Sequence, residues 1–223
     1  GLIAPINEIF KLGKKYNSIN LLDASQTSGL LDINLENKNI DCVIFSGHKS
    51  LYAPFGIAGM VVKSDINLTP LIYGGTGINS LDIDMPQFYP ERLEAGSMDI
   101  YALAGLNASL KWIEKMGSDN IYSVESELLK YTIDRFKELS QVKCFIPKDK
   151  QIAILSFGIR GYSPDEISEI LSNNDIAVRS GLHCAPDAHK LMGTLPGGTV
   201  RLGFSFFNNK KDIDKLLKVV SDL

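Results

Sequence analysis

The chain has 223 residues, of which 44% are hydrophobic and 22% are charged, and its formal net charge is −3. This composition is that of a globular protein with one large or two small domains, and it gives no basic surface that would favour nucleic acid. No apolar run reaches the roughly 18 residues that a membrane span needs. The three cysteines have no metal-ligand spacing, which predicts a reducing, cytoplasmic location and no metal site.

Two short apolar runs near the start of the chain each lead into a charged residue. Residues 19–22 end at Asp23, and residues 42–45 lead through Ser46 to Lys49. Short apolar runs bounded by turn residues are typical of strands in the core of a sheet. If the two strands are parallel neighbours, Asp23 and Lys49 emerge at the same edge, where open α/β sheets bind their ligands.

Lys49 is surrounded in sequence by large apolar residues, namely Phe45, Leu51, Tyr52 and Phe55. These neighbours predict a partly buried lysine, and burial disfavours the ammonium form and leaves an amine that can attack a carbonyl. Pyridoxal 5′-phosphate (PLP) offers a carbonyl for the lysine and a ring nitrogen for the carboxylate of Asp23. Ser46 and His48 are candidate donors to its phosphate. The alternative is a snorkelling lysine in a structural ion pair.

The remainder of the first half is predicted to hold two helices and a glycine-containing loop. One helix begins at Pro5, and a longer one covers residues 101–116, with Ser97 as its N-cap and Gly117 at its end. Residues 73–77 could hold a phosphate with backbone amides, but a loop at a subunit contact is favoured. We place a domain boundary after Gly117, which gives domains of residues 1–117 and 118–223.

The second half predicts a small α+β domain in which short strands and helices alternate. Ser163 and Glu166 form a capping-box pattern around Pro164, so a helix is expected to begin there. The expected strands are residues 142–145, 152–157, 176–179 and 199–204, and the expected last helix is residues 210–223.

Residues 178–186 contain a second group of side chains that could take part in a reaction. Cys184 follows His183 and lies five residues from Arg179, an electropositive setting that favours a thiolate. The alternative is a cysteine buried as a small hydrophobe. His183 and His189 are candidates to titrate near neutral pH, although a packing or capping role is favoured for His189.

Two arginines of the predicted small domain, Arg179 and Arg201, are candidates to bind an anion. A guanidinium presents a planar fork that binds a carboxylate through two hydrogen bonds, as recognition of an amino acid requires. Pairing with a surface carboxylate is the alternative for each of them.

Five motifs, in order along nearly the whole chain, resemble the class V PLP-dependent enzymes, closest to the SufS/CsdA-like cysteine desulfurases. They are DASQTSG (residues 23–29), FSGHKSLYAPFGIAG (45–59), RLEAGS (92–97), VRSGLHCAP (178–186) and TVRLGFSFFN (199–208). The resemblance implies the carboxyl-terminal half of such an enzyme. The expected fold is then α/β, a PLP-dependent transferase of fold type I, with part of the large domain followed by the α+β small domain.

The resemblance also implies how the cofactor is held. Lys49 would carry PLP, Asp23 would keep its ring nitrogen protonated, and Gln26 would hydrogen-bond its ring hydroxyl. Ser97 would reach a phosphate in the partner subunit's site, so a homodimer is expected.

For the reaction, the resemblance implies that Cys184 attacks the sulfur of an L-cysteine substrate and leaves alanine. Arg201 would hold the substrate carboxylate, with Arg179 as a secondary contact near Cys184. The resulting persulfide would pass to a sulfur-acceptor protein, for iron-sulfur cluster assembly or other sulfur chemistry.

One departure from the family pattern weakens the choice of substrate. SufS-like enzymes typically carry two histidines before the cysteine, whereas this chain has Leu182 and His183. The alternatives are therefore another class V enzyme, such as a selenocysteine lyase or a transaminase, or an inactive half-chain. No nucleic-acid or membrane partner is expected.

Overall fold

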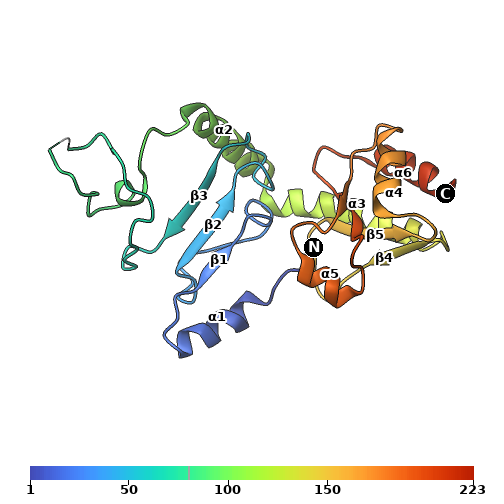
Figure 1. Cartoon of the computed structure of the whole chain (residues 1–223), viewed down its shortest axis with the longest axis horizontal. Helices are drawn as coiled ribbons and strands as arrows, with labels where there is room; N and C mark the ends of the chain where they lie inside the picture. Colours follow the sequence, from blue (N-terminus) through green and yellow to red (C-terminus); the bar gives the residue numbers. More distant parts are fainter. Residues whose placement is uncertain (80) are drawn as a thin grey trace. The chain divides into compact units, whose positions relative to one another are not determined.

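The computed structural model describes residues 1–79 and 81–223. The chain divides into two compact units: Pro5–Ser118, and Asp119–Leu223 together with Gly1–Ala4 (Figure 1). The division after Ser118 lies one residue from the predicted boundary. Among the described residues, no helix has the length and apolar character to span a membrane.

The first four residues differ from the prediction, which placed them with the first domain. The backbone N–H of Ile3 donates to the carbonyl of Lys150 over 3.0 Å, and the N–H of Ile152 donates to the carbonyl of Gly1 over 2.9 Å. Because these main-chain hydrogen bonds continue into an isolated bridge between Leu2 and Gln151, Gly1–Ala4 belong to the second unit.

The unit Pro5–Ser118 contains a three-stranded sheet in the order β1-β2-β3. β1 and β2 are parallel, with Asp23 opposite Ile44, whereas β3 runs antiparallel to β2 (Figure 1). The parallel pairing on which the sequence argument depends is thus confirmed. The elements of this unit are α1 (Ile6–Lys15), β1 (Leu21–Asp23), β2 (Cys42–Ser46), β3 (Ala58–Val62), the 3₁₀ helix η1 (Glu91–Leu93) and α2 (Ile100–Met116).

A buried ion pair holds α1 to the start of β2. Asp41 is only 3% exposed, and its carboxylate accepts hydrogen bonds from Lys14 Nζ at 2.5 and 2.6 Å and from the N–H of Asn20 at 2.8 Å. Burial alone would raise the pKa of Asp41, but these donors outweigh it and the pKa lies below its ordinary value. This network fixes the position from which β2 runs towards Lys49.

Helix α2 begins at a different cap from the predicted one. Asp99 is the N-cap, and its carboxylate accepts hydrogen bonds from the N–H groups of Tyr101 and Ala102, both at 3.0 Å. The expectation that Ser97 caps this helix is therefore wrong, since Asp99 lies nearer the first turn and also places a negative charge at the positive end of the helix dipole. Gly117 ends the helix as predicted.

The unit Asp119–Leu223 is built on a four-stranded antiparallel sheet in the order β4-β5-β7-β6. Its core includes side chains with no exposed surface, among them Leu155, Phe157, Ile167, Leu171 and Val200. The elements are α3 (Ser118–Phe136), which begins at the boundary, β4 (Val142–Phe145), β5 (Ile154–Ile159), α4 (Pro164–Ser172), β6 (Arg179–Gly181), α5 (Pro186–Met192), β7 (Thr199–Gly203) and α6 (Lys210–Ser221).

Most elements of this unit agree with the sequence, and three differ. The strand expected at residues 152–157 begins and ends two residues later, at Ile154–Ile159. The capping box of Ser163 and Glu166 is present at the start of α4. The strand expected at residues 176–179 is instead Arg179–Gly181, because its pairing with β7 begins only where Arg179 faces Arg201. Helix α5 was not predicted, since seven residues are too few for a helical period to stand out.

Candidate active site

The carboxyl ends of the parallel strands β1 and β2 bring Asp23 and Lys49 to one edge of the sheet. Asp23 is the last residue of β1, and Lys49 follows three residues after β2 ends at Ser46. The positive charge of Lys49 contributes to the lowered pKa of Asp23, so the two groups interact electrostatically. Both side chains are exposed.

Asp23 is held in its ionised form mainly by Ser25. Hydrogen bonds from the hydroxyl and the backbone N–H of Ser25 lower the pKa of Asp23, the backbone bond to Oδ1 being 2.9 Å long. Lys49 adds a smaller contribution in the same direction. An ionised carboxylate at this position fits a partner with a protonated ring nitrogen.

The turn after β2 depends on a close backbone approach at Gly47. The N–H of Gly47 donates to the carbonyl of Ile57 over 2.8 Å, and a Cβ at position 47 would lie 2.4 Å from Ile57 Cγ2. Only glycine fits this approach without displacing the neighbouring strand. The turn therefore brings Ser46, His48 and Lys49 into one short, well-defined segment.

The prediction that apolar neighbours bury Lys49 is wrong. Leu51 turns into the core, with 5% of its surface exposed, while Phe55 is 82% exposed and stacks on the ring of His48 at 4.7 Å. Neither side chain covers Lys49, so it remains in solvent in this chain. His48 Nδ1 lies 3.2 Å from Ser46 Oγ, and the role of these two groups as donors to a phosphate stays a prediction.

Gln26 and Ser97, the other predicted cofactor contacts, are both exposed. Gln26 lies in the turn that follows Asp23, where Thr27 N–H donates to the Ala24 carbonyl over 3.0 Å. Ser97 lies in the loop before Asp99. Their roles towards a cofactor stay predictions.

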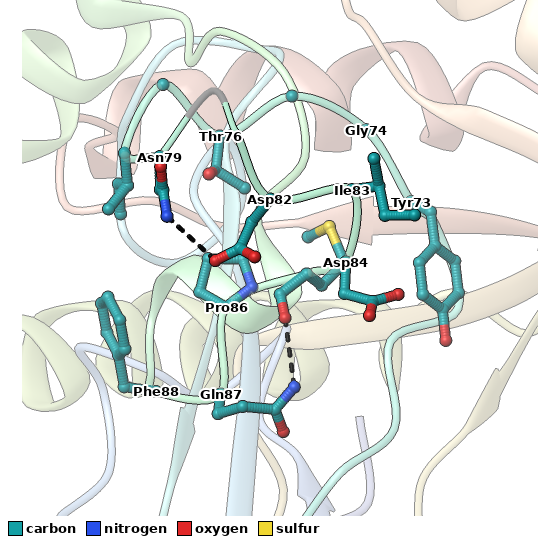
Figure 2. Close-up of a pocket in the computed structure, with 14 residues that line it drawn as sticks. Tyr73, Gly74, Thr76, Asn79, Asp82, Ile83, Asp84, Pro86, Gln87 and Phe88 are labelled. Carbon is teal, nitrogen blue, oxygen red and sulfur yellow. Dashed lines mark hydrogen bonds between the residues drawn. The ribbon is translucent and has the colours of Figure 1, made fainter.

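Residues 73–79 and 82–88, which include the glycine-containing segment, line a partly open pocket of about 890 Å³ (Figure 2). Asn79 Nδ2 donates to Asp82 Oδ2 over 3.0 Å, and Gln87 Nε2 donates to the Met85 carbonyl over 3.2 Å (Figure 2). The carboxylates of Asp82 and Asp84 line it and would repel a phosphate. The pocket therefore does not favour the phosphate-binding reading of this loop.

In the second unit, the residues around Cys184 form a loop with unusual backbone geometry. Gly181, His183 and Cys184 have φ angles of +98°, +51° and +60°. For the two non-glycine residues this left-handed conformation costs roughly 1 kcal/mol or more each, so surrounding contacts must hold it. The result is an exposed thiol directly after β6 and before α5.

Two guanidinium groups belong to the same loop and its sheet. Arg179 Nη2 donates to Cys184 Sγ over 3.7 Å. Arg179 and Arg201 are direct cross-strand partners of β6 and β7, and no ion pair to a carboxylate is found for either among the described residues. Burial, followed by the charge of Arg179, lowers the pKa of Arg201. Two like charges placed side by side favour an anionic ligand between them.

His183 does not behave as the sequence suggested. Burial, followed by the charges of Arg201, His189 and Arg179, lowers the pKa of His183 to about 4, so it stays neutral at physiological pH. Its Nε2 lies 3.3 Å from Thr199 Oγ1. His189 is buried, with Nδ1 2.8 Å from Thr194 Oγ1, and so has the packing role that the sequence favoured.

Each unit thus gathers part of the predicted site: Asp23, Gln26, Ser46, His48 and Lys49 in one, and Arg179, Cys184 and Arg201 in the other. Sequence reasoning missed Ser25 and Thr199. An Asx-type contact two residues after Asp23 was a usable signal for Ser25. For Thr199 the signal was its place opposite Gly181 in an antiparallel pair, which required knowing the register.

Comparison with known proteins decides the family. The family model for aminotransferase class-V matches residues 1–216. The chain belongs to this family. Families of this class are PLP-dependent, and the resemblance drawn from the five motifs is confirmed.

Named relatives narrow the comparison. The chain is 33% identical over its whole length to a probable cysteine desulfurase of Pyrococcus abyssi, of which it covers 56%. It is 31% identical to a probable cysteine desulfurase of Mycolicibacterium paratuberculosis over 99% of its length and 32% of that protein. The chain spans about half or less of the length of these relatives.

Solved structures confirm the fold. The apo structure of a cysteine desulfurase from Thermococcus onnurineus NA1 has a TM-score of 0.91, with 31% identity, over 100% of this chain and 56% of that one. The Escherichia coli cysteine desulfurase CsdA has a TM-score of 0.89 at 24% identity, over 100% of this chain and 55% of that one, and supports the fold alone. The chain thus has part of the PLP-dependent fold type I.

Proposed function

We propose that the chain contributes to a PLP-dependent cysteine desulfurase that converts L-cysteine to L-alanine and retains the sulfur on Cys184. The observation that carries this proposal is the exposed Cys184 thiol, which accepts a hydrogen bond from Arg179 beside a second guanidinium, Arg201. A neighbouring guanidinium stabilises a thiolate, which is the nucleophilic form of cysteine. Relatives named as cysteine desulfurases support the same activity.

The cofactor residues would be those at the edge of the β1–β2 pair. Lys49 would bind the carbonyl carbon of PLP, and the ionised Asp23 would hold a proton on its ring nitrogen. Gln26 would contact the ring hydroxyl, and Ser46, His48 and Ser97 would contact a phosphate, Ser97 in a partner subunit. When bound, PLP supplies an acceptor for the electron pair of a breaking bond.

At the second unit, Arg201 would bind the substrate carboxylate and Arg179 would stabilise the Cys184 thiolate. The thiolate attacks the sulfur of the substrate, so an S–S bond forms and the carbon–sulfur bond of the substrate breaks. The electron pair stays on the substrate carbon, which takes up a proton and becomes the methyl group of alanine. Cys184 is left as a persulfide.

The persulfide would pass to a sulfur-acceptor protein in a reducing compartment such as the cytoplasm, for iron-sulfur cluster assembly or other sulfur metabolism. We also propose a homodimer. Exposed apolar side chains on the loop after β3 support a subunit contact there: Leu71, Leu81 and Ile83 are 94–100% exposed.

The test of the cofactor site is reductive trapping on the whole chain. The protein is mixed with PLP and reduced with borohydride, and pyridoxyl-peptides are mapped by mass spectrometry. An adduct confined to Lys49, lost in Lys49→Ala and kept in the exposed control Lys11→Ala, supports the assignment. An adduct spread over surface lysines contradicts it for this chain alone.

The test of the reaction follows. Alanine and sulfide are measured with L-cysteine and a thiol reductant, for the wild type, for Cys184→Ala and for the control Cys144→Ala. We expect activity to be lost only in Cys184→Ala. Undiminished alanine formation by that variant would contradict the role of Cys184. Selenocysteine and other amino acids, tested in parallel, distinguish the lyase and transaminase alternatives.

A further inference from the structure

The strained loop that presents Cys184 is held at its centre by a side chain that the proposed reaction does not use. His183 and Cys184 are consecutive non-glycine residues with positive φ angles. Such a pair persists only where neighbouring contacts compensate for the strain. The contacts of the Cys184 side chain do not provide this, since it is exposed and its hydrogen bond comes from the exposed side chain of Arg179.

The side chain of His183 connects the loop to the interior of the sheet. Its Nε2 lies 3.3 Å from the hydroxyl of Thr199, a residue of β7 that is only 4% exposed. Its ring lies 5.6 Å from the ring of His189, which is itself buried in the last turn of α5 and bound to Thr194. The loop is thereby connected to two elements that follow it in the chain, α5 and β7.

The other ring nitrogen shows which form of His183 occupies this place. Nδ1 is buried and has no hydrogen-bond partner among the described residues. A proton there would be an unsatisfied buried donor close to the positive charges of Arg179 and Arg201. The neutral ring that donates from Nε2 to Thr199 leaves only a lone pair unsatisfied, which costs less.

The thiol, in turn, receives its hydrogen bond from Arg179 and not from His183. A general base must lie within hydrogen-bond reach of the proton that it removes. Nε2 of His183 is turned to Thr199, and Nδ1 is enclosed. The histidine next to the cysteine in sequence is therefore not its base.

We propose that His183 is a positioning residue: as an uncharged side chain bound to Thr199, it fixes the left-handed turn that keeps Cys184 Sγ against Arg179. The proposal refines the proposed function, because it assumes that Cys184 is the nucleophile that accepts sulfur. The groups that face His183 are Arg201 and Thr199 from β7, Arg179 from β6 and His189 from α5.

The experiment measures the alkylation rate of Cys184 by iodoacetamide in the full chain, with each cysteine followed by peptide mass spectrometry. It needs neither PLP nor substrate, so failure of the desulfurase proposal leaves its result readable. Cys42 is buried, and burial raises the pKa of Cys144 to about 11, so both are slow internal references.

Two substitutions at position 183 separate the anchor from the backbone strain. His183→Gly removes the side chain and also relieves the strain, because glycine adopts positive φ freely. We expect Cys184 to react about fivefold more slowly at pH 7, the factor that one lost hydrogen bond of ordinary strength produces. His183→Gln keeps a group that reaches Thr199, and we expect it to stay within about twofold of the wild type.

A third variant tests the same contact from the other side. Thr199→Val removes the hydroxyl but keeps the volume of this buried side chain, and we expect the same slowing as in His183→Gly. This variant also decides the matter if His183→Gly fails to fold. Wild-type reactivity in Thr199→Val or in a folded His183→Gly would overturn the proposal.

The pH profile distinguishes an anchor from a base. We expect the rates of the wild type and His183→Gln to follow curves of the same shape between pH 5 and 8, because His183 remains neutral throughout that range. A base would add a step near pH 6.5 to the wild-type curve that is absent in His183→Gln. Observation of that step would overturn the proposal.

Discussion

The two units of the chain surround their candidate site residues in different ways. Around Cys184, the thiol, Arg179, Arg201 and the neutral His183 lie on or beside a four-stranded sheet with fully buried side chains on its core face. Around Lys49, the lysine and Asp23 stand in solvent, with Asp23 at the end of the three-residue β1 and Lys49 in the turn after β2. Apolar side chains of this sheet, such as Met60 and Val61, are 39% and 48% exposed.

This difference shows that two requirements of a site are met separately: the arrangement of its side chains, and the burial and neighbouring charges that tune their reactivity. The β1–β2 pair already sets the order and direction of Asp23 and Lys49, but it supplies no desolvation. The Cys184 thiol, by contrast, already lies beside the positive charge of Arg179. The chain spans about half of its relatives' length, and we expect Lys49 to be the group whose chemistry changes most when further protein surface covers this edge.

The largest effect is expected from opening the core of the second unit. Phe157 is fully buried, packs 5.1 Å from the ring of Phe136 and lies opposite Cys144 in the β4–β5 pair. Phe157→Ala should lower the free energy of unfolding by about 4 kcal/mol. Alkylation of Cys144 during a urea titration reports this unit, whereas fluorescence of Trp112, the single tryptophan, reports the other.

The exposed Phe207→Ala is the control and should change stability by less than about 0.5 kcal/mol. In Phe157→Ala we expect the Cys144 transition to move and the Trp112 transition to stay near its wild-type position. Equal movement of both would show that the two units unfold together, and the contrast between them would then lose its energetic basis.

An intermediate effect is expected in the first unit, from its buried ion pair. Lys14→Met leaves the carboxylate of Asp41 buried, with the Asn20 N–H as its remaining hydrogen-bond donor among the described residues. Because Lys14 is itself 36% exposed, we expect a loss of about 2 kcal/mol, less than for a fully buried pair. Trp112 fluorescence in urea measures it, with the exposed Lys15→Met as the control. An unchanged midpoint would mean that solvent reaches Asp41.

The smallest effect is a pH dependence that belongs to His183 alone. Well above pH 6.5, His183 is neutral in both the folded and the unfolded chain, so it adds no pH dependence there. As the pH falls from 6.5 to about 4, the unfolded chain takes up a proton that the folded chain refuses, so stability decreases in this window. The melting temperature of the wild type should therefore fall more steeply than that of His183→Gln.

The comparison is made between the two proteins at each pH, because the carboxylates titrate equally in both. If the melting temperatures of the wild type and His183→Gln fall equally between pH 6.5 and 4, His183 is not buried in its neutral form. The alkylation rate of Cys184 would then be the only measurement that tests the role of His183.

Much of the fold could be predicted from local sequence patterns, because these patterns depend only on residues that are neighbours in sequence. The apolar runs that end at Asp23 and Ser46 indicated two strands, and Ser163 and Glu166 indicated the start of α4. The burial of Lys49 could not be predicted in the same way, because it depended on where Leu51 and Phe55 turn after the strand ends.

The sequence also could not decide between two residues that suit the same structural position about equally well. Ser97 and Asp99 are both good cap residues two positions apart, and only the first turn of α2 decides between them. The positive φ angles of His183 and Cys184 fall on residues that rarely adopt them, so no local rule points there. The loop that contains them contacts Thr199 of β7, which is separated from β6 in sequence by the whole of α5.

The close backbone contact between Gly198 and Gly181, beside the loop that carries Cys184, limits how the sequence of this chain can change. Gly198 has a φ of +83°, and a Cβ there would lie 2.1 Å from the carbonyl oxygen of Gly181. Any other residue at position 198 would have to lift the backbone that carries the thiol. A position fourteen residues from Cys184, with no side chain and no chemistry of its own, is therefore closed to substitution in any descendant that keeps the loop in this shape.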